Sequence, residues 1–210
     1  MKTHIYAFGS ICRGDVQYGS DIDLLALVDR PTCNFDSTKF SIYSHNRISE
    51  LWNEGNPFAW HLHHESRLIF SSDDEDYIKN LKAPNPYTNC HMDCKKFNDL
   101  ILEASESLNM SRTTCTFDLS TIFLGMRNIA TCFALGYLNR PIFARNSALN
   151  IGTYSINIDI SAYKALERAR ILCTRGYGDK LSSFEIAKAL DSLVSIQEWA
   201  KATVSMSEGI

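Results

Sequence analysis

The sequence has no apolar run long enough to cross a lipid bilayer. Its longest uninterrupted apolar runs, such as residues 24–28, are far shorter than the roughly 20 residues that a membrane-spanning helix needs. Residues 1–4 lead into no apolar segment of the kind that a secretory signal contains. We therefore expect a cytoplasmic protein with no membrane partner.

Neither sign of charge is in large excess. The chain has 21 Lys and Arg against 24 Asp and Glu, a net charge of -3, and no run of basic residues. Charge therefore gives no global reason to bind a nucleic-acid backbone or an anionic membrane, although a local basic patch stays open. With 45% hydrophobic and 21% charged residues, the composition is that of a folded globular protein.

The cysteines and histidines do not form the pattern of a disulfide framework or a zinc site. The seven cysteines, an odd number scattered along a chain without a secretory signal, indicate reduced thiols. His61, His63 and His64 are too close in sequence to face together on a helix, and no cysteine pair with zinc-site spacing accompanies them. Residues 90–94, Cys-His-Met-Asp-Cys, are interpreted as a chance cluster in a linker.

The first part of the chain alternates between strand and helix patterns. Short apolar or alternating segments rich in strand formers predict strands, and apolar residues three or four apart predict helices. The predicted strands are residues 4–8, 21–28, 40–44 and 67–70, and the predicted helices are residues 47–54 and 57–65. A mixed sheet with helices follows from this order.

A boundary is predicted near residue 82. The acidic stretch 73–76 leads into residues 83–86, where two prolines disfavour both helix and central strand. Beyond it the apolar spacing is helical, and the predicted helices are residues 95–108, 115–137, 161–175 and 183–203. We therefore expect an α+β protein, with a small mixed-sheet domain at 1–82 and an all-α bundle at 83–210. The connection 140–158 is long for a bundle, and such loops are often functional.

Asp21 and Asp23 are the most informative pair of residues. Side chains alternate along a strand, so two aspartates two residues apart point to the same face. Their carboxylates repel each other unless a cation neutralises them, and oxygen ligands without sulfur or imidazole suit Mg2+ or Mn2+. The pair predicts a metal site at the entrance to a strand.

Gly9 and Ser10 end the first predicted strand. A glycine turn that opens a helix exposes unpaired backbone N–H groups, which together with a hydroxyl can bind phosphate. The phosphate turn and the metal site are expected to share one pocket.

Residues 8–24 contain both features in the order G-S-x10-D-x-D, with Arg13-Gly14 after the Gly-Ser pair and Ser20 before the first aspartate. This run resembles the signature of the nucleotidyltransferases related to DNA polymerase beta, in particular their small bacterial members. The resemblance implies transfer of a nucleoside monophosphate from an NTP, for which ATP is one candidate, to an acceptor hydroxyl, with release of pyrophosphate.

The same resemblance implies roles for the residues of the signature. Asp21 and Asp23 would be catalytic and would hold the Mg2+ or Mn2+ ions that bridge the triphosphate. Gly9, Ser10 and Ser20 belong to the NTP site, and Arg13 either contacts phosphate or forms a surface salt bridge.

Active members of this family usually have a third carboxylate on the next strand. That strand, residues 40–44, contains no acid here. Asp36, Glu50 and Glu65 are the candidates to reach the site from elsewhere, and Glu65 is the favoured one of the three as a catalytic carboxylate. The alternative for Glu65 is a structural role at the end of a helix with solvated histidines, and it outweighs the catalytic one. Without a third carboxylate, the protein would be a catalytically degenerate nucleotidyltransferase that binds nucleotide or another protein.

Two arginines of the helical half need partners. Arg127 lies within a predicted apolar helix and Arg145 in the long connection. Each is either a structural ion pair or a contact to phosphate or acceptor. Arg127-Asn128 also resembles the motif of HEPN ribonucleases, but no histidine follows at the required spacing, so ribonuclease activity is the least favoured alternative.

The acceptor is expected in a cleft between the two domains. In the family that the signature resembles, acceptors are small molecules, proteins or nucleic-acid ends, and the helical half is similar in architecture to the bundles of antibiotic nucleotidyltransferases. The acidic balance of the chain favours a small molecule or a protein over long nucleic acid, with a tRNA end still open.

Overall fold

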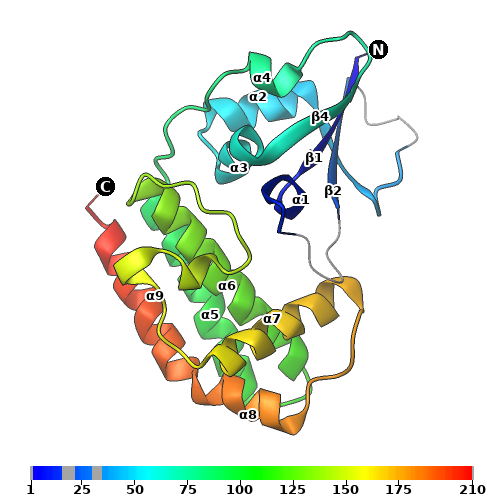
Figure 1. Cartoon of the computed structure of the whole chain (residues 1–210). Coiled ribbons are helices and arrows are strands. Elements are labelled where there is room, and N and C mark those ends of the chain that lie inside the picture. The colour runs from blue at the N-terminus through cyan, green and yellow to red at the C-terminus, as the bar shows by residue number, and fades with distance from the viewer. Residues whose placement is uncertain (1, 16–21, 30–34, 210) are drawn as a thin grey trace. The chain divides into compact units, whose positions relative to one another are not determined.

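The fold is α+β, as the sequence predicts. The computed structural model describes residues 2–15, 22–29 and 35–209, and it divides into two compact units, Met1–Thr88 and Asn89–Ile210 (Figure 1). The first unit contains a mixed four-stranded sheet, and the second is helical.

The sheet has the strand order β3-β2-β1-β4. Its strands are β1 (Thr3–Phe8), β2 (Asp23–Val28), β3 (Phe40–Ser44) and β4 (Ser66–Ser71). The central strand β1 is antiparallel to both β2 and β4, whereas β2 is parallel to β3. The two strands of the Gly-Ser and Asp-x-Asp signature are therefore direct neighbours.

The described residues of this unit form four helices: α1 (Ser10–Arg13), α2 (His45–Asn53), α3 (Pro57–Glu65) and α4 (Tyr77–Asn80). Local capping chemistry begins the two longer ones. The Ser44 side chain accepts a hydrogen bond from the Arg47 N–H at the start of α2, and the Asn56 side chain accepts one from the Phe58 N–H at the start of α3. Pro57 at the first position of α3 loses no helical hydrogen bond.

The core of the first unit lies between one face of the sheet and α2–α4. Tyr6 and Phe8 of β1 alternate with residues on the other face, as do Leu25 and Leu27 of β2. These four side chains pack on a set of helical residues: Ile48, Leu51, Trp52, Ala59, Leu62 and Ile78. By the same alternation, Asp23 stands on this face of β2, at the start of the strand.

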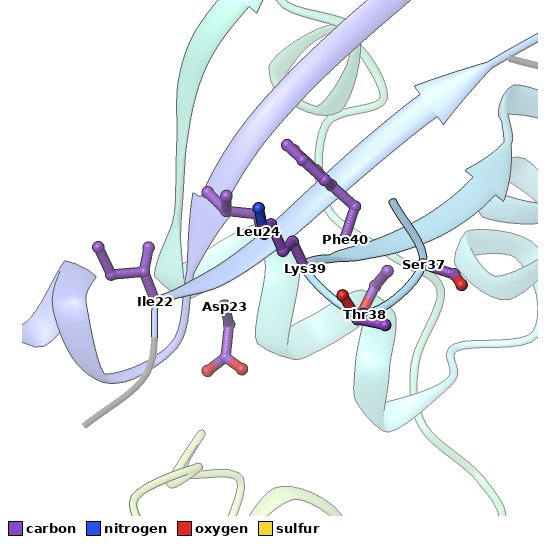
Figure 2. A pocket seen from close by; sticks show the side chains of 8 residues that line it. Ile22, Asp23, Leu24, Ser37, Thr38, Lys39 and Phe40 are labelled. Carbon is purple, nitrogen blue, oxygen red and sulfur yellow. The ribbon is translucent and has the colours of Figure 1, made fainter. Parts of the chain in front are cut away.

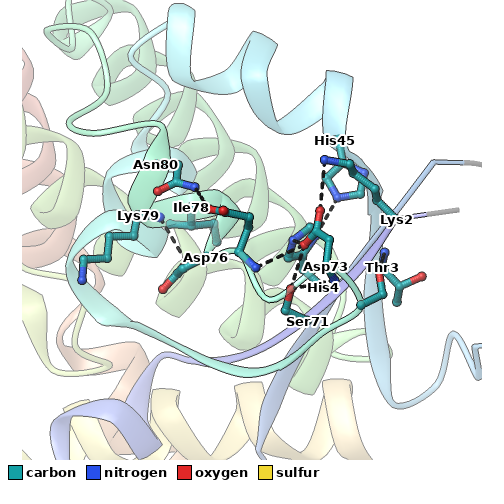
Figure 3. Close-up of polar contacts among 12 residues, drawn as sticks. Lys2, Thr3, His4, His45, Ser71, Asp73, Asp76, Ile78, Lys79 and Asn80 are labelled. Atoms are coloured by element: carbon teal, nitrogen blue, oxygen red, sulfur yellow. Dashed lines mark hydrogen bonds and ion pairs between the residues drawn. The ribbon is translucent and has the colours of Figure 1, made fainter.

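Two buried histidines lie at the end of the sheet opposite to Asp23 and belong to a chain of polar contacts there (Figure 3). His4 Nδ1 lies 2.9 Å from His45 Nε2, and His4 Nε2 lies 3.0 Å from the Asp73 carboxylate. Lys2 Nζ pairs with the other oxygen of Asp73 at 3.0 Å, and His45 Nδ1 lies 3.1 Å from Asp29. This chain of polar contacts joins β1, the start of α2 and the turn after β4.

The segment after α4 is attached to the first unit. The Asn85 N–H donates to the Trp52 carbonyl at 3.0 Å, and the Trp60 indole N–H donates to the Asn85 carbonyl at 3.1 Å. Gly55, with φ +63°, lies so close to Pro86 that a Cβ would be 2.3 Å from its carbonyl oxygen. These contacts explain why the observed division falls after Thr88, beyond the position near residue 82 expected from the prolines.

The second unit is built around the apolar helix α6. Its helices are α5 (Cys90–Met110), α6 (Cys115–Gly136), α7 (Ile160–Arg175), α8 (Ser183–Asp191) and α9 (Leu193–Ser207). By length and composition α6 could cross a membrane, but 67% of its most apolar window is buried within the structure, which is typical of a bundle's core helix.

The helix α5 begins five residues earlier than expected and includes the segment 90–94. The predicted linker is helical because both of its cysteines are buried against α6. The Cys90 thiol donates to the Cys132 carbonyl at 3.4 Å, and the Cys94 thiol donates to the Ile129 carbonyl at 3.8 Å. Packing thus decided a helix start that composition did not reveal.

The single helix predicted at 183–203 was wrong, because the chain forms α8 and α9 instead. The Ser192 N–H donates to the Ala189 carbonyl, three residues back, at 3.2 Å, and its hydroxyl donates to the Lys188 carbonyl at 3.2 Å. These bonds end α8, because a serine hydroxyl competes with backbone N–H groups for the carbonyl acceptors of the helix.

The helices α5 and α6 approach each other closely at Gly125. A Cβ at this position would lie 2.5 Å from Ile101 Cγ1 and 3.0 Å from the Phe97 carbonyl oxygen. We therefore expect Gly125→Ala to lower the free energy of unfolding by about 1–3 kcal/mol, the usual effect of overpacking, measured by urea denaturation. Gly209→Ala, where a Cβ meets nothing within 4 Å, is the control. Equal stability of the two variants would contradict this packing.

Stability should fall in mild acid because of His45. Burial, and then the neighbouring His4, hold the pKa of His45 below its ordinary value of 6.5. As the pH falls through 6.5, the unfolded chain binds a proton that the folded chain does not, so the free energy of unfolding decreases.

Thermal melts between about pH 5 and 7.5 test this prediction. Asp29 and Asp73 take up protons only below this pH range, because their pKa values are both lowered. Burial also lowers the pKa of His63, so the comparison with His45→Asn isolates the histidine of interest. The variant should lose less stability on acidification than the wild type, and an unchanged slope would count against the assignment.

Candidate functional site

The signature residues that the structure describes meet at one end of the sheet. Phe8, the last residue of β1, pairs with Asp23 at the start of β2 and with Ser66 at the start of β4. Gly9 follows Phe8, and Glu65 precedes Ser66. The antiparallel registers therefore bring Gly9, Asp23 and Glu65 to the same edge, although they are far apart in sequence.

Gly9 lies beside the Asp23 carboxylate. Its φ of +75° and ψ of -139° are accessible essentially to glycine alone. A Cβ at this position would lie 2.8 Å from Asp23 Oδ2. Glycine is thus required at this position for two reasons: the backbone conformation, and the carboxylate that lies where a Cβ would be.

The turn after Gly9 is a single helical turn, α1. The Cys12 N–H donates to the Gly9 carbonyl at 3.0 Å, and the Asp15 N–H donates to the Ser10 carbonyl at 3.0 Å. Gly14 ends the turn in the left-handed conformation. One turn of helix carries the Arg13 side chain back toward the start of β4.

Glu65 holds this turn at both ends. Its main-chain carbonyl accepts the Gly9 N–H at 3.0 Å, and its carboxylate accepts a hydrogen bond from Arg13 Nη1. His61, one turn earlier in α3, lies with its Nε2 2.9 Å from the same carboxylate. The Glu65 side chain is only 12% exposed, so both partners act on a largely desolvated charge.

Aromatic packing and a second carboxylate fix the partners of Glu65. The His61 ring lies edge-on to Phe8, with ring centroids 5.7 Å apart, and Arg13 Nε donates to Asp15 at 3.0 Å. The i,i+4 spacing of His61 and Glu65 on one helix is the sequence signal that could have identified this pair.

A pocket of about 410 Å³ opens at the starts of β2 and β3 (Figure 2). It is lined by Ile22, Asp23, Leu24, Ser37, Thr38, Lys39, Phe40 and Ser41. In the close-up, the Asp23 carboxylate points away from the Leu24 and Phe40 side chains, as alternation along the strand requires. The residues of β3 and the turn before it were not among the predicted site residues.

Ser41 lies on β3, the strand on which a third carboxylate was expected. It pairs with Leu25 across the parallel β2–β3 ladder and so belongs to the same sheet face as Asp23. Of the proposed substitutes, Asp36 accepts two hydrogen bonds from Thr38 in the turn before β3, and Glu50 pairs with Arg47 on the exposed surface of α2. Glu65 precedes Ser66, which pairs with Phe8, so it lies at the edge that holds Asp23. Asp36 lies at the same edge, because it precedes Ser37 and Thr38 of the pocket lining.

The donor chemistry at this edge fits a hard divalent cation. Asp23 provides carboxylate oxygens, and the missing Cβ of Gly9 leaves the main chain close to them. Asp21 and Ser20 lie outside the described residues. Within residues 2–15, 22–29 and 35–209, no group of three His, Cys, Asp or Glu side chains is placed to hold a metal, so a metal site here depends on Asp21 together with Asp23.

The two arginines of the second unit support the long connection 140–158. Arg127 Nη2 donates to the Phe143 carbonyl at 3.1 Å, and the Ser147 hydroxyl donates to the Arg127 carbonyl at 3.1 Å. Arg145 pairs with Glu167 of α7 at 3.6 Å. The connection itself contains the short helices η1 (Ser147–Leu149) and η2 (Gly152–Tyr154). A role of Arg127 in NTP binding stays a prediction.

Comparison with known proteins identifies the first unit. Residues 2–83 match the family described as the nucleotidyltransferase domain. No curated protein sequence matches the chain. Among solved structures, the chain is similar to spectinomycin adenyltransferase AAD(9) from Enterococcus faecialis, crystallised with ATP and spectinomycin. The sequence identity is 11% and the TM-score 0.46, over 94% of this chain and 91% of that chain.

Gly9→Ala should disturb both the turn and Asp23. The positive φ and the 2.8 Å contact to Asp23 Oδ2 are expected to lower the free energy of unfolding by about 1–3 kcal/mol and to weaken NTP binding measured by titration calorimetry. Gly14→Ala is the matched control, since φ is +78° there but a Cβ would meet nothing within 4 Å. If Gly14→Ala weakened NTP binding as much, the contact to Asp23 would not be the cause.

Proposed function

We propose that the chain, whose residues 2–83 match the nucleotidyltransferase domain family, transfers a nucleoside monophosphate from an NTP to the hydroxyl of a small molecule or protein. The observation that carries the proposal is the position of Asp23 against the Gly9 main chain at one edge of the sheet. This arrangement places a carboxylate beside a turn whose backbone an anion can approach.

The roles of the chain's own groups follow from that edge. Asp23, together with Asp21, would hold Mg2+ or Mn2+, which neutralises triphosphate charge and favours deprotonation of the acceptor hydroxyl. Ser10 binds the triphosphate through its main-chain N–H and its hydroxyl, and Gly9 leaves room for the phosphate because it has no Cβ. The acceptor oxygen forms a bond to the α-phosphorus, and the bond from that phosphorus to pyrophosphate breaks.

The pocket beside Asp23 supports an acceptor of modest size. Its volume of about 410 Å³ lies in the range of small-molecule sites. Ser37, Thr38 and Ser41 provide hydroxyls and Lys39 an ammonium group along its wall, which suits a polar acceptor. The net charge of -3 disfavours a long nucleic acid, and ATP is the first NTP to test.

A second candidate is nucleotide binding without transfer. It is favoured by the absence of an acid from β3, where the third carboxylate was expected, and by the contacts of Glu65 with Arg13 and His61. Such a protein would bind an NTP at the same turn but would lack a base for the acceptor proton.

The deciding experiment follows the label from each α-32P-labelled NTP. The protein is incubated with Mg2+ and cell extract, and protein, RNA and small-molecule fractions are separated. We expect label in the small-molecule or protein fraction, and a loss of at least about 100-fold in the Asp21→Ala/Asp23→Ala variant, because removal of metal-binding carboxylates removes the main electrostatic stabilisation.

Glu50→Gln is the control for a lost surface carboxylate, since Glu50 is 60% exposed and pairs only across the surface of α2 with Arg47. It should keep wild-type transfer. NTP binding without label in any fraction would refute transfer and support the second candidate.

A further inference from the structure

One residue, Glu65, forms hydrogen bonds with both ends of the phosphate turn, residues 9–13. Its carbonyl oxygen accepts the Gly9 N–H at 3.0 Å, at the start of the turn. Its carboxylate accepts from Arg13 Nη1, at the end of the turn. The position of the turn relative to α3 and β4 therefore depends on Glu65 more directly than on any hydrophobic contact within α1, which contains no buried residue.

The carboxylate of Glu65 lies between two nitrogen donors. His61 Nε2 lies 2.9 Å from Oε2, the same oxygen that Arg13 contacts. The Glu65 and His61 side chains are 12% and 13% exposed, so these contacts are shielded from solvent and stronger than at the surface. A metal bound at Oε2 would therefore have to displace Arg13 or His61.

The guanidinium of Arg13 is oriented by two carboxylates. Nε donates to Asp15 at 3.0 Å, and Nη1 donates to Glu65. A guanidinium is planar and has five N–H donors, so these two bonds fix its plane and use only part of its donor capacity. An arginine fixed at the end of a phosphate turn is well placed to contribute to triphosphate binding without moving.

We propose that Glu65 is a positioning residue that holds the phosphate turn and Arg13 for the triphosphate, and that it is not the third metal ligand. This inference rests on the proposed function, because it assigns the turn to NTP binding. It replaces the catalytic role expected for Glu65 from the sequence. His61, whose ring packs edge-on against Phe8, supports Glu65 through its contact with Oε2.

A double-mutant cycle of Arg13→Ala and Glu65→Ala tests the proposal. The readout is the Kd of fluorescent mant-ATP and mant-GTP, measured by anisotropy once in EDTA and once in Mg2+. A positioning residue acts through Arg13, so Glu65→Ala should weaken metal-free binding about tenfold in the wild type and less than about twofold in the Arg13→Ala background. Equal losses in both backgrounds would overturn the proposal.

The Mg2+ dependence separates positioning from metal binding. Glu65→Gln keeps the shape of the side chain and a carbonyl acceptor for Arg13, so it guards against a variant that fails to fold, as checked by thermal melting. We expect it to raise the KM for NTP and to leave the Mg2+ concentration for half-maximal transfer within about twofold of the wild type. A large rise in that Mg2+ concentration, with unchanged nucleotide affinity in EDTA, would show a metal ligand and overturn the proposal.

Glu54→Gln is the matched control, because Glu54 also pairs with an arginine, Arg47, but at the exposed surface of α2. It should change neither the Kd nor the Mg2+ dependence. The double-mutant cycle measures nucleotide binding and not transfer. If the wild type binds mant-NTP but transfers no label, the proposed transfer is refuted, and the cycle still decides the role of Glu65.

Discussion

The antiparallel pairing of Phe8 with Asp23 is the constraint on which the site depends. It places the last residue of β1 against the first residue of β2, and Gly9, which follows with a positive φ, lies so near the Asp23 carboxylate that a Cβ there would be 2.8 Å from Oδ2. A slip of one residue would turn Asp23 to the other sheet face and expose Leu25 and Leu27. Because those leucines are fully buried on α2 and α3, the core enforces the geometry of the polar edge.

The two ends of the sheet use their charged groups differently. At the end formed by His4 and Val28, buried histidines and carboxylates pair with one another and connect β1 to α2 and to the turn after β4. At the other end, Glu65 fixes a turn that carries Gly9 and Arg13, next to a pocket lined by hydroxyls and Lys39. The first arrangement stabilises the fold, and the second leaves polar groups beside an open pocket where a substrate can reach them.

Several elements could be predicted because their signals are local. The strand 40–44 and the helix 57–65 have the observed bounds, since alternation and the Asn56-Pro57 start are encoded within a few residues. The start of α5 at Cys90 and the break at Ser192 could not be predicted, because they depend on a carbonyl of α6 and on competition between helical hydrogen bonds. The attachment of residues 83–88 to the first unit likewise depends on Trp52 and Trp60, distant in sequence.

The sequence alone determined the α+β class, the four strands with the longer helices between them, and the signature that is typical of a nucleotidyltransferase domain, because each of these depends on residue spacing along a short stretch of chain. Only the tertiary structure decided the surroundings of Glu65. The ion pair with Arg13 cannot be predicted from sequence, because the two residues are far apart in the chain. The i,i+4 contact to His61 is positioned by the packing of α3 beside Phe8. A carboxylate's role is set by the charges that surround it, and those come from separate elements that folding brings together.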